Sequence, residues 1–228
     1  MHRLDLTELE GRIGYRFRNR NLLQSALTHT SFANEQKLHD YTDYERLEFL
    51  GDSILEMVSS AFLYGQYPDK REGELTRMRA SLVCEQALDA SASQIGLSEF
   101  IQLGKGEEAC GGRHKESILA DVVEAIIGAI YLDCGELAPA RAFIMRFILS
   151  DHENRVLFYD AKTALQEKMQ AKGIRIRYEI LDEKGPEHDK RYVAGVMLGG
   201  KLAARGTGRS KKAAEQQAAY RALRGQEL

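Results

Sequence analysis

The stretch ERLEFLGDS, Glu45 to Ser53, places two acids within a run of apolar residues. Glu48 and Asp52 are four residues apart, so on a helix both carboxylates project from one face, about 5–6 Å apart at Cβ. Much of the remaining surface of that helix is apolar, contributed by Leu47, Phe49, Leu50, Ile54, Leu55 and Val58. Acids among so much core-forming surface cost free energy unless something compensates for their charge. The stretch therefore predicts a partly buried helix in which another group compensates for the charge of the two acids.

A second segment, ESILADVVEAIIGAIYLD at residues 116–133, repeats the arrangement with Asp121 and Glu124 three residues apart. Its other positions are apolar nearly all round, which is typical of a buried helix. Gly51 lies inside the first helix, where it costs about 1 kcal/mol relative to alanine, and close approach of another helix would explain it. Gly128 gives the second helix a similar small-residue face. We expect the two helices to pack closely and to bring the four acids together as a divalent-metal site.

Carboxylate oxygens are hard ligands, and they favour Mg²⁺ or Mn²⁺ over zinc. Such a cation lowers the pKa of water, which makes it a better nucleophile, and it neutralises charge that grows on a scissile phosphate. The sequence leaves open whether one or two metal ions act at the site. The predicted site would therefore be able to activate a water molecule and to stabilise negative charge on a phosphate.

The hydrophobic pattern divides the chain into two kinds of domain. Apolar residues recur at helical spacing from about residue 6 to residue 150, which predicts an all-α domain over residues 1–150. Residues 151–159 are interpreted as a linker of limited mobility, and residues 160–228 as a small α+β domain in the order α-β-β-β-α. Its expected elements are a helix at 161–171, strands near 177–181, 192–198 and 202–206, and a helix that Ser210 caps and that runs to about 223.

Charge is distributed unevenly between these parts. Residues 1–159 hold 17 basic and 25 acidic residues, a net charge of −8, whereas residues 160–228 hold 15 and 9, a net charge of +6. An acidic body with a basic tail domain suggests that the body binds metal and the tail binds a polyanion. The chain has no apolar run of 18 residues and a polar amino terminus, so we expect a cytoplasmic protein without a membrane partner. Its three widely spaced cysteines indicate neither disulfides nor zinc, and we expect them to be buried free thiols.

Four motifs occur in an order that identifies a family. They are LTHTSFAN at 27–34, ERLEFLGD at 45–52, EGELTRMRA at 72–80 and ESILADVVEA at 116–125. With these motifs the chain closely resembles bacterial ribonuclease III, and its last third resembles a double-stranded-RNA-binding domain. The resemblance covers nearly the whole chain.

The resemblance implies a Mg²⁺-dependent endoribonuclease, with Mn²⁺ as a possible substitute. It would cut double-stranded RNA to leave 5′-phosphate and 3′-hydroxyl ends with a short 3′ overhang, and would process structured rRNA and mRNA precursors. All four acids would be direct or water-mediated metal ligands, with Asp52 and Glu124 as catalytic residues. Glu72 would lie near the substrate, and Glu45 would lie near the substrate in the surroundings of the metal site or at the dimer contact. The nuclease domains would form a homodimer in which Phe49 is buried by the partner subunit.

In the C-terminal domain we expect three regions to contact RNA. Polar residues on the first helix would meet one minor groove, a histidine in the loop between strands would meet a second, and residues at the start of the last helix would bind the phosphates between them. These residues are Thr163, Gln166 and Glu167 on the first helix, His188 in the loop, and Arg209, Ser210, Lys211 and Lys212 at the last helix.

Two other functions fit part of the pattern. A non-catalytic protein that binds double-stranded RNA would be expected to have lost one of the four acids, and all four are present. A phosphohydrolase of small molecules would have no need for the basic tail domain. Elsewhere, His29 is interpreted as a structural histidine, and Gly104–Gly106 as a turn of a glycine-rich loop rather than a phosphate-binding loop.

Overall fold

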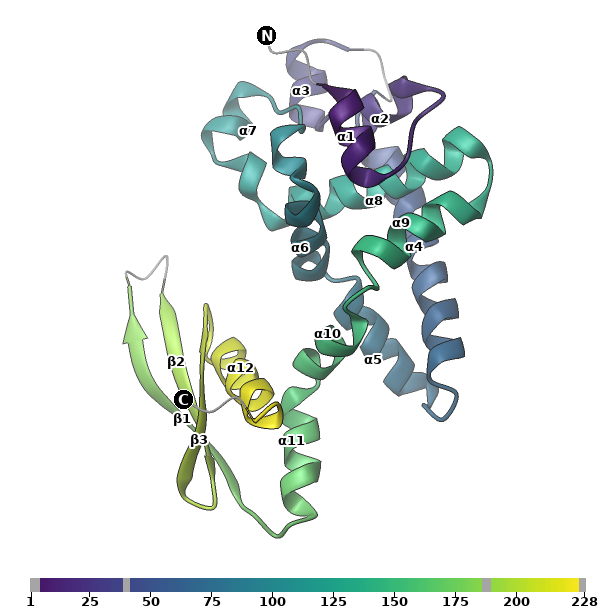
Figure 1. The fold of residues 1–228 in the computed structure, drawn as a ribbon. Helices are drawn as coiled ribbons and strands as arrows, with labels where there is room; N and C mark the ends of the chain where they lie inside the picture. The colour runs from purple at the N-terminus through teal and green to yellow at the C-terminus, as the bar shows by residue number, and fades with distance from the viewer. Residues whose placement is uncertain (1–4, 39–41, 186–189, 226–228) are drawn as a thin grey trace. The chain divides into compact units, whose positions relative to one another are not determined.

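The computed structural model describes residues 5–38, 42–185 and 190–225. It divides into two compact units, Met1–His152 and Glu153–Leu228. Each unit has its own core of buried apolar side chains. Figure 1 shows the helices and strands of both units. In the described residues, no helix combines the length and apolar character that crossing a lipid bilayer requires.

The first unit is built from helices, as the spacing of apolar residues predicts. Caps mark several helix ends; for example, the Asp5 side chain accepts hydrogen bonds from the backbone of Thr7 and Glu8, and Gly14 ends the same helix with a positive φ. In chain order the helices are α1 (Leu6–Ile13), α2 (Arg20–Ala26), α3 (Thr30–Glu35), α4 (Glu45–Gln66), α5 (Glu72–Leu82), α6 (Glu85–Ile95), α7 (Lys105–Ala109), α8 (Glu116–Cys134) and α9 (Leu137–Phe147), with 3-10 helices at Leu97–Glu99 and Gly112–His114.

Helix α8 is the centre of this unit, since it packs against α2, α4, α6 and α9. Its contact with α4 is made backbone to backbone at two glycines. A Cβ atom on Gly51 would lie 1.8 Å from the carbonyl oxygen of Glu124, and one on Gly128 would lie 2.3 Å from that of Leu47. The close helix packing predicted from Gly51 is confirmed, and it fixes the two acid-bearing helices against each other.

The second unit contains a three-stranded antiparallel sheet in the order β1-β2-β3. Its buried core joins the sheet to two helices through residues such as Leu165, Val196 and Ala218. The elements are α10 (His152–Tyr159), α11 (Ala161–Gln170), β1 (Ile176–Lys184), β2 (Arg191–Leu198), β3 (Lys201–Gly208) and α12 (Lys211–Leu223). The predicted all-α domain followed by an α-β-β-β-α domain is confirmed, with strands one to three residues longer than expected at several ends.

Two segments differ from the sequence interpretation. The expected turn at Gly104–Gly106 leads instead into α7, whose first backbone N–H groups are held by α3: the Gly104 N–H donates to the Ser31 hydroxyl at 2.9 Å and the Lys105 N–H to Glu35 at 2.8 Å. The expected linker at 151–159 is mostly helix α10. The three cysteines are free, but the expectation that they are buried is wrong: Cys110 is exposed, and Cys84 and Cys134 are partly exposed.

Candidate metal centre and nucleic-acid interface

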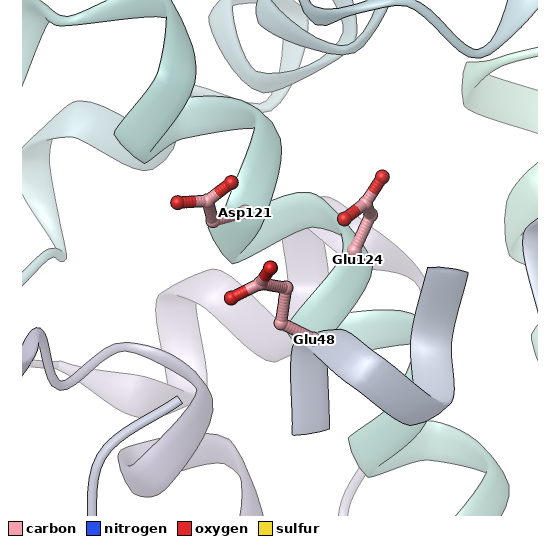
Figure 2. Close-up of side chains that lie close together, drawn as sticks. All are labelled: Glu48, Asp121 and Glu124. Carbon is pink, nitrogen blue, oxygen red and sulfur yellow. The ribbon is translucent and has the colours of Figure 1, made fainter. Parts of the chain in front are cut away.

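Three acids from α4 and α8 form a compact group where the two helices are in closest contact. Glu48, Asp121 and Glu124 each offer an oxygen, and these oxygens all lie within 4.8 Å of one another. Figure 2 shows the three side chains on the same side of the two helices, Glu48 from α4 and the others from α8. Because Gly51 lets the backbone of Glu124 approach α4, the helix contact itself sets the spacing of this acid cluster.

Burial and mutual repulsion both act on the acid cluster. Burial, followed by the charges of Asp52, Glu48 and Asp121, raises the pKa of Glu124 to about 8. The pKa of Glu48 is raised by burial and then by the charge of Asp121. Among the described residues, no lysine or arginine forms an ion pair with a member of the cluster. In the part of the chain that the structure describes, the charge of the acid cluster is therefore not balanced by a lysine or arginine ion pair.

Asp52 lies outside the acid cluster, although the sequence grouped it with the other three. Its side chain is exposed on α4, one turn beyond Glu48. It is nevertheless close enough for its charge to be the largest electrostatic contribution that raises the pKa of Glu124. The structure thus brings together three of the four predicted ligands and leaves the fourth beside them, facing solvent.

The donor set of the acid cluster fits a hard divalent cation. All its ligand atoms are carboxylate oxygens, as Mg²⁺ and Mn²⁺ prefer, and neither cysteine nor histidine is among them. A cation would also relieve the repulsion that, after burial, raises the pKa values of Glu48 and Glu124. The residues present therefore suit the predicted metal ion, on the grounds of both ligand type and charge.

A polar surface lies on the two helices of the second unit. Thr163, Gln166 and Glu167 are exposed on α11, and the intervening Leu165 is buried in the core. The Ser210 hydroxyl caps α12 by accepting a hydrogen bond from the Ala213 N–H at 3.1 Å.

The start of α12 carries the exposed basic residues Arg209, Lys211 and Lys212. The Lys211 ammonium forms an ion pair with Glu183 of β1 at 3.1 Å. His188, predicted to contact RNA, lies outside the described residues. The other residues predicted to bind RNA are all exposed, as contact with RNA requires.

Comparison with known families accounts for both units. A family model described as Ribonuclease-III-like matches residues 19–152, and a model described as Double-stranded RNA binding motif matches residues 161–225. The chain belongs to the ribonuclease III family. It is therefore an endoribonuclease that carries a double-stranded-RNA-binding domain.

Relatives in the ribonuclease III family resemble the chain over most of its length. Ribonuclease 3 of Carboxydothermus hydrogenoformans is 46% identical, with 96% of that protein and 98% of this chain covered. Ribonuclease 3 of Bacillus licheniformis is 45% identical, with 88% of that protein and 95% of this chain covered. The solved nuclease domain of ribonuclease III from Campylobacter jejuni is 39% identical, with a TM-score of 0.59 over 64% of this chain and 97% of that one.

The sequence interpretation missed one residue of this ribonuclease III site. Tyr44, immediately before α4, is buried, and its hydroxyl donates a hydrogen bond to the Asp121 carboxylate at 3.2 Å. Burial raises the pKa of Tyr44, so its hydroxyl remains a donor. The neighbouring His29 accepts a hydrogen bond from the Ser31 N–H at 3.0 Å and caps α3, as expected of a hydrogen-bonded structural histidine.

The remaining predicted residues of the nuclease domain lie on its surface. Glu45 is exposed in the first turn of α4. Glu72 is exposed at the start of α5, accepts a hydrogen bond from the Thr76 hydroxyl at 2.8 Å, and lines a cavity of about 760 Å³ between α4 and α5. Phe49 is 77% exposed. It borders a cavity of about 630 Å³ that Leu22, Leu47, Leu50 and Leu132 also line.

Proposed function

We propose that the chain hydrolyses phosphodiester bonds in double-stranded RNA with Mg²⁺, or with Mn²⁺ in its place. The products would be 5′-phosphate and 3′-hydroxyl ends with a short 3′ overhang, and the natural substrates would be structured precursors of rRNA and mRNA. The observation that carries this proposal is the acid cluster, an all-oxygen site on two tightly packed helices of a ribonuclease III domain.

In this proposal Glu48, Asp121 and Glu124 hold the cation, and Asp52 contributes directly or through water from its exposed position beside them. When bound, the cation supplies charge neutralisation at the scissile phosphate and makes water acidic enough to attack at neutral pH. The helices contribute rigidity, since the contacts at Gly51 and Gly128 leave no room for α4 and α8 to approach further. The acids therefore need little rearrangement to bind metal.

The second unit would supply affinity for the RNA. The exposed polar residues of α11 suit the shallow minor groove of A-form RNA, and the lysines at the start of α12 suit phosphates. Recognition of this kind depends on the shape and charge of the duplex more than on its sequence. Binding should therefore weaken steeply as salt rises.

The first experiment is a cleavage assay on end-labelled double-stranded RNA, with Mg²⁺ or with EDTA, for the wild type and for Glu124→Gln. We expect Mg²⁺-dependent cutting that is lost in the variant, while both proteins retard the RNA equally in a gel with EDTA. Glu108→Gln is the control, since Glu108 pairs with Arg113 outside the acid cluster. RNA binding without cutting by the wild type would instead favour a non-catalytic RNA-binding protein. Cutting that ignores whether the RNA is double-stranded would favour the small-molecule phosphohydrolase.

We also propose that two nuclease domains form a homodimer through the face around Phe49. An exposed aromatic ring beside this hollow would be self-complementary under a two-fold axis, because each ring could pack on the leucines in the hollow of the other subunit. Ser25, Asp43, Glu45 and Arg46 also line the hollow. In the Campylobacter jejuni nuclease domain, a region takes part in dimer formation. Light scattering should give twice the monomer mass for the wild type and the monomer mass for Phe49→Ala.

Tyr64→Ala is the matched control, since Tyr64 is also 77% exposed on α4 and does not border this hollow. A monomeric wild type at micromolar concentration would contradict the dimer. The cytoplasmic location and the division at 1–150, 151–159 and 160–228 remain predictions. Cell fractionation and limited proteolysis, respectively, would test them.

A further inference from the structure

Tyr44 links the start of α4 to the acid cluster by a contact that does not depend on the two glycines. The residue is 4% exposed, and its hydroxyl donates to Oδ2 of Asp121 at 3.2 Å. Among the described residues, this is the one hydrogen bond that the Asp121 side chain accepts. The two residues are 77 positions apart in the chain, so the bond is a tertiary contact between the helix carrying Glu48 and the helix carrying Asp121.

We propose that Tyr44 is a positioning residue that fixes the Asp121 carboxylate in the orientation in which it binds the cation. This inference rests on the proposed function of the acid cluster. Rotation of an aspartate carboxylate about its last torsion is only weakly restricted, so an unpartnered carboxylate samples many orientations. A hydrogen bond to one of its oxygens restricts that rotation and leaves the remaining lone pairs to the metal.

The hydroxyl can act in this way because the tyrosine itself is held firmly. Its backbone N–H donates to the carbonyl of Thr28 at 3.0 Å, and its own carbonyl accepts from the Glu48 N–H at 2.9 Å. Its ring meets the ring of His29 edge to face, with centroids 5.6 Å apart. These contacts hold the Tyr44 hydroxyl in one place. Its hydrogen bond therefore holds the Asp121 carboxylate in one orientation.

The test is Tyr44→Phe, which removes the hydroxyl and keeps the buried ring. The chain offers a matched control in Tyr15→Phe, since the Tyr15 hydroxyl donates to Asp133 at 2.8 Å in the same domain but outside the acid cluster. Mn²⁺ binding to the full chain without RNA would be measured by calorimetry or paramagnetic resonance. Cleavage would be measured against both Mg²⁺ and RNA concentration.

For Tyr44→Phe we expect Mn²⁺ affinity to fall about tenfold or more, the usual effect of losing a hydrogen bond that orients a metal ligand. The Mg²⁺ concentration for half-maximal cleavage should rise in parallel, KM for RNA should not change, and excess metal should restore kcat. Tyr15→Phe should leave all four quantities unchanged. Tyr15→Phe removes a comparable tyrosine–aspartate hydrogen bond from the same domain, so a loss of Mn²⁺ affinity confined to Tyr44→Phe separates positioning from a merely structural role.

Three results would overturn the inference. Wild-type Mn²⁺ affinity in Tyr44→Phe would do so, as would an equal loss in both variants or a loss of kcat that excess metal does not restore. If the wild type cleaves and binds Mn²⁺ while Tyr44→Phe matches it, the positioning role fails and the proposed function stands. If the wild type neither binds Mn²⁺ nor cleaves, both fail together.

Discussion

Replacing Glu124 with glutamine should stabilise the metal-free protein at alkaline pH, although it removes a residue of the acid cluster. Burial and the neighbouring acids raise the pKa of Glu124 from 4.5 to about 8. The folded state therefore binds a proton more tightly than the unfolded state. Stability from this group is fully present below pH 4.5 and is lost as pH rises through about 8. Glutamine carries no charge, so the variant should escape this loss.

The size of the effect follows from the rise in pKa. A rise from 4.5 to about 8 corresponds to a ceiling of about 5 kcal/mol in the free energy of unfolding. Glu124 is only half-buried, so solvent and counterions screen the repulsion, and we expect roughly 1–2 kcal/mol. For a domain of this size that gain raises Tm by about 2–8 °C.

The assay is thermal unfolding in EDTA at pH 5, 7 and 9. The gap between Glu124→Gln and the wild type should be small at pH 5 and largest at pH 9. Mg²⁺ should then close or reverse it, because the wild type gains more from binding metal.

Glu108→Gln is the control, and its effect on the stability of the fold should have the opposite sign to that of Glu124→Gln. A hydrogen bond from Arg113 lowers the pKa of Glu108, so that variant should lose stability at neutral and alkaline pH and not at low pH. A Glu124→Gln protein no more stable than the wild type at pH 9, or a gap that does not grow with pH, would refute the reasoning.

Three further predictions concern packing and RNA binding. Gly51→Ala should lower the free energy of unfolding in urea by at least about 3 kcal/mol, because its Cβ would lie 1.8 Å from the Glu124 carbonyl oxygen. Gly65→Ala on the same helix, where an added Cβ would have no atom within 4 Å, should not lower it. Ser210→Ala should destabilise the RNA-binding domain by about 1 kcal/mol through loss of its cap, measured by unfolding of that domain in the full chain. Lys212→Gln should weaken RNA binding for all duplex sequences and reduce the slope of log affinity against log salt by about one, and an unchanged slope would exclude a phosphate contact.

The sequence was most informative where local rules and tertiary packing agree. Apolar spacing located α4 and α8, and Gly51 indicated their close contact because a glycine inside a helix is costly without such a reason. The cap at Ser210 and the glycine turns located the elements of the second domain. Helix α7 was missed because its first N–H groups are satisfied by residues of α3, which no local pattern reveals.

The candidate site was predicted only in part, because some of its contacts are likewise not revealed by any local pattern. Spacing of four residues places Glu48 and Asp52 on one helix face, but it does not decide which turn of that face meets α8. Helix α8 is in closest contact with α4 along the stretch of α4 from Leu47 to Gly51. Glu48, inside this stretch, therefore faces the acids of α8, while Asp52, just beyond it, remains exposed. Tyr44 was missed because its partner Asp121 is 77 residues away and nothing near Tyr44 in sequence indicates the contact.

The first turn of α12 has a consequence for the energetics of RNA binding. It holds two lysines and no acidic residue at the end of the helix where the macrodipole is positive. Each lysine there opposes the dipole at a cost of about 0.3–1 kcal/mol, which the pairing of Lys211 with Glu183 offsets only in part. A phosphate at this end would reverse the sign of the interaction. The domain thus keeps a helix whose charge suits a polyanion better than it suits the free protein, and we expect part of the affinity for RNA to come from the release of that internal repulsion.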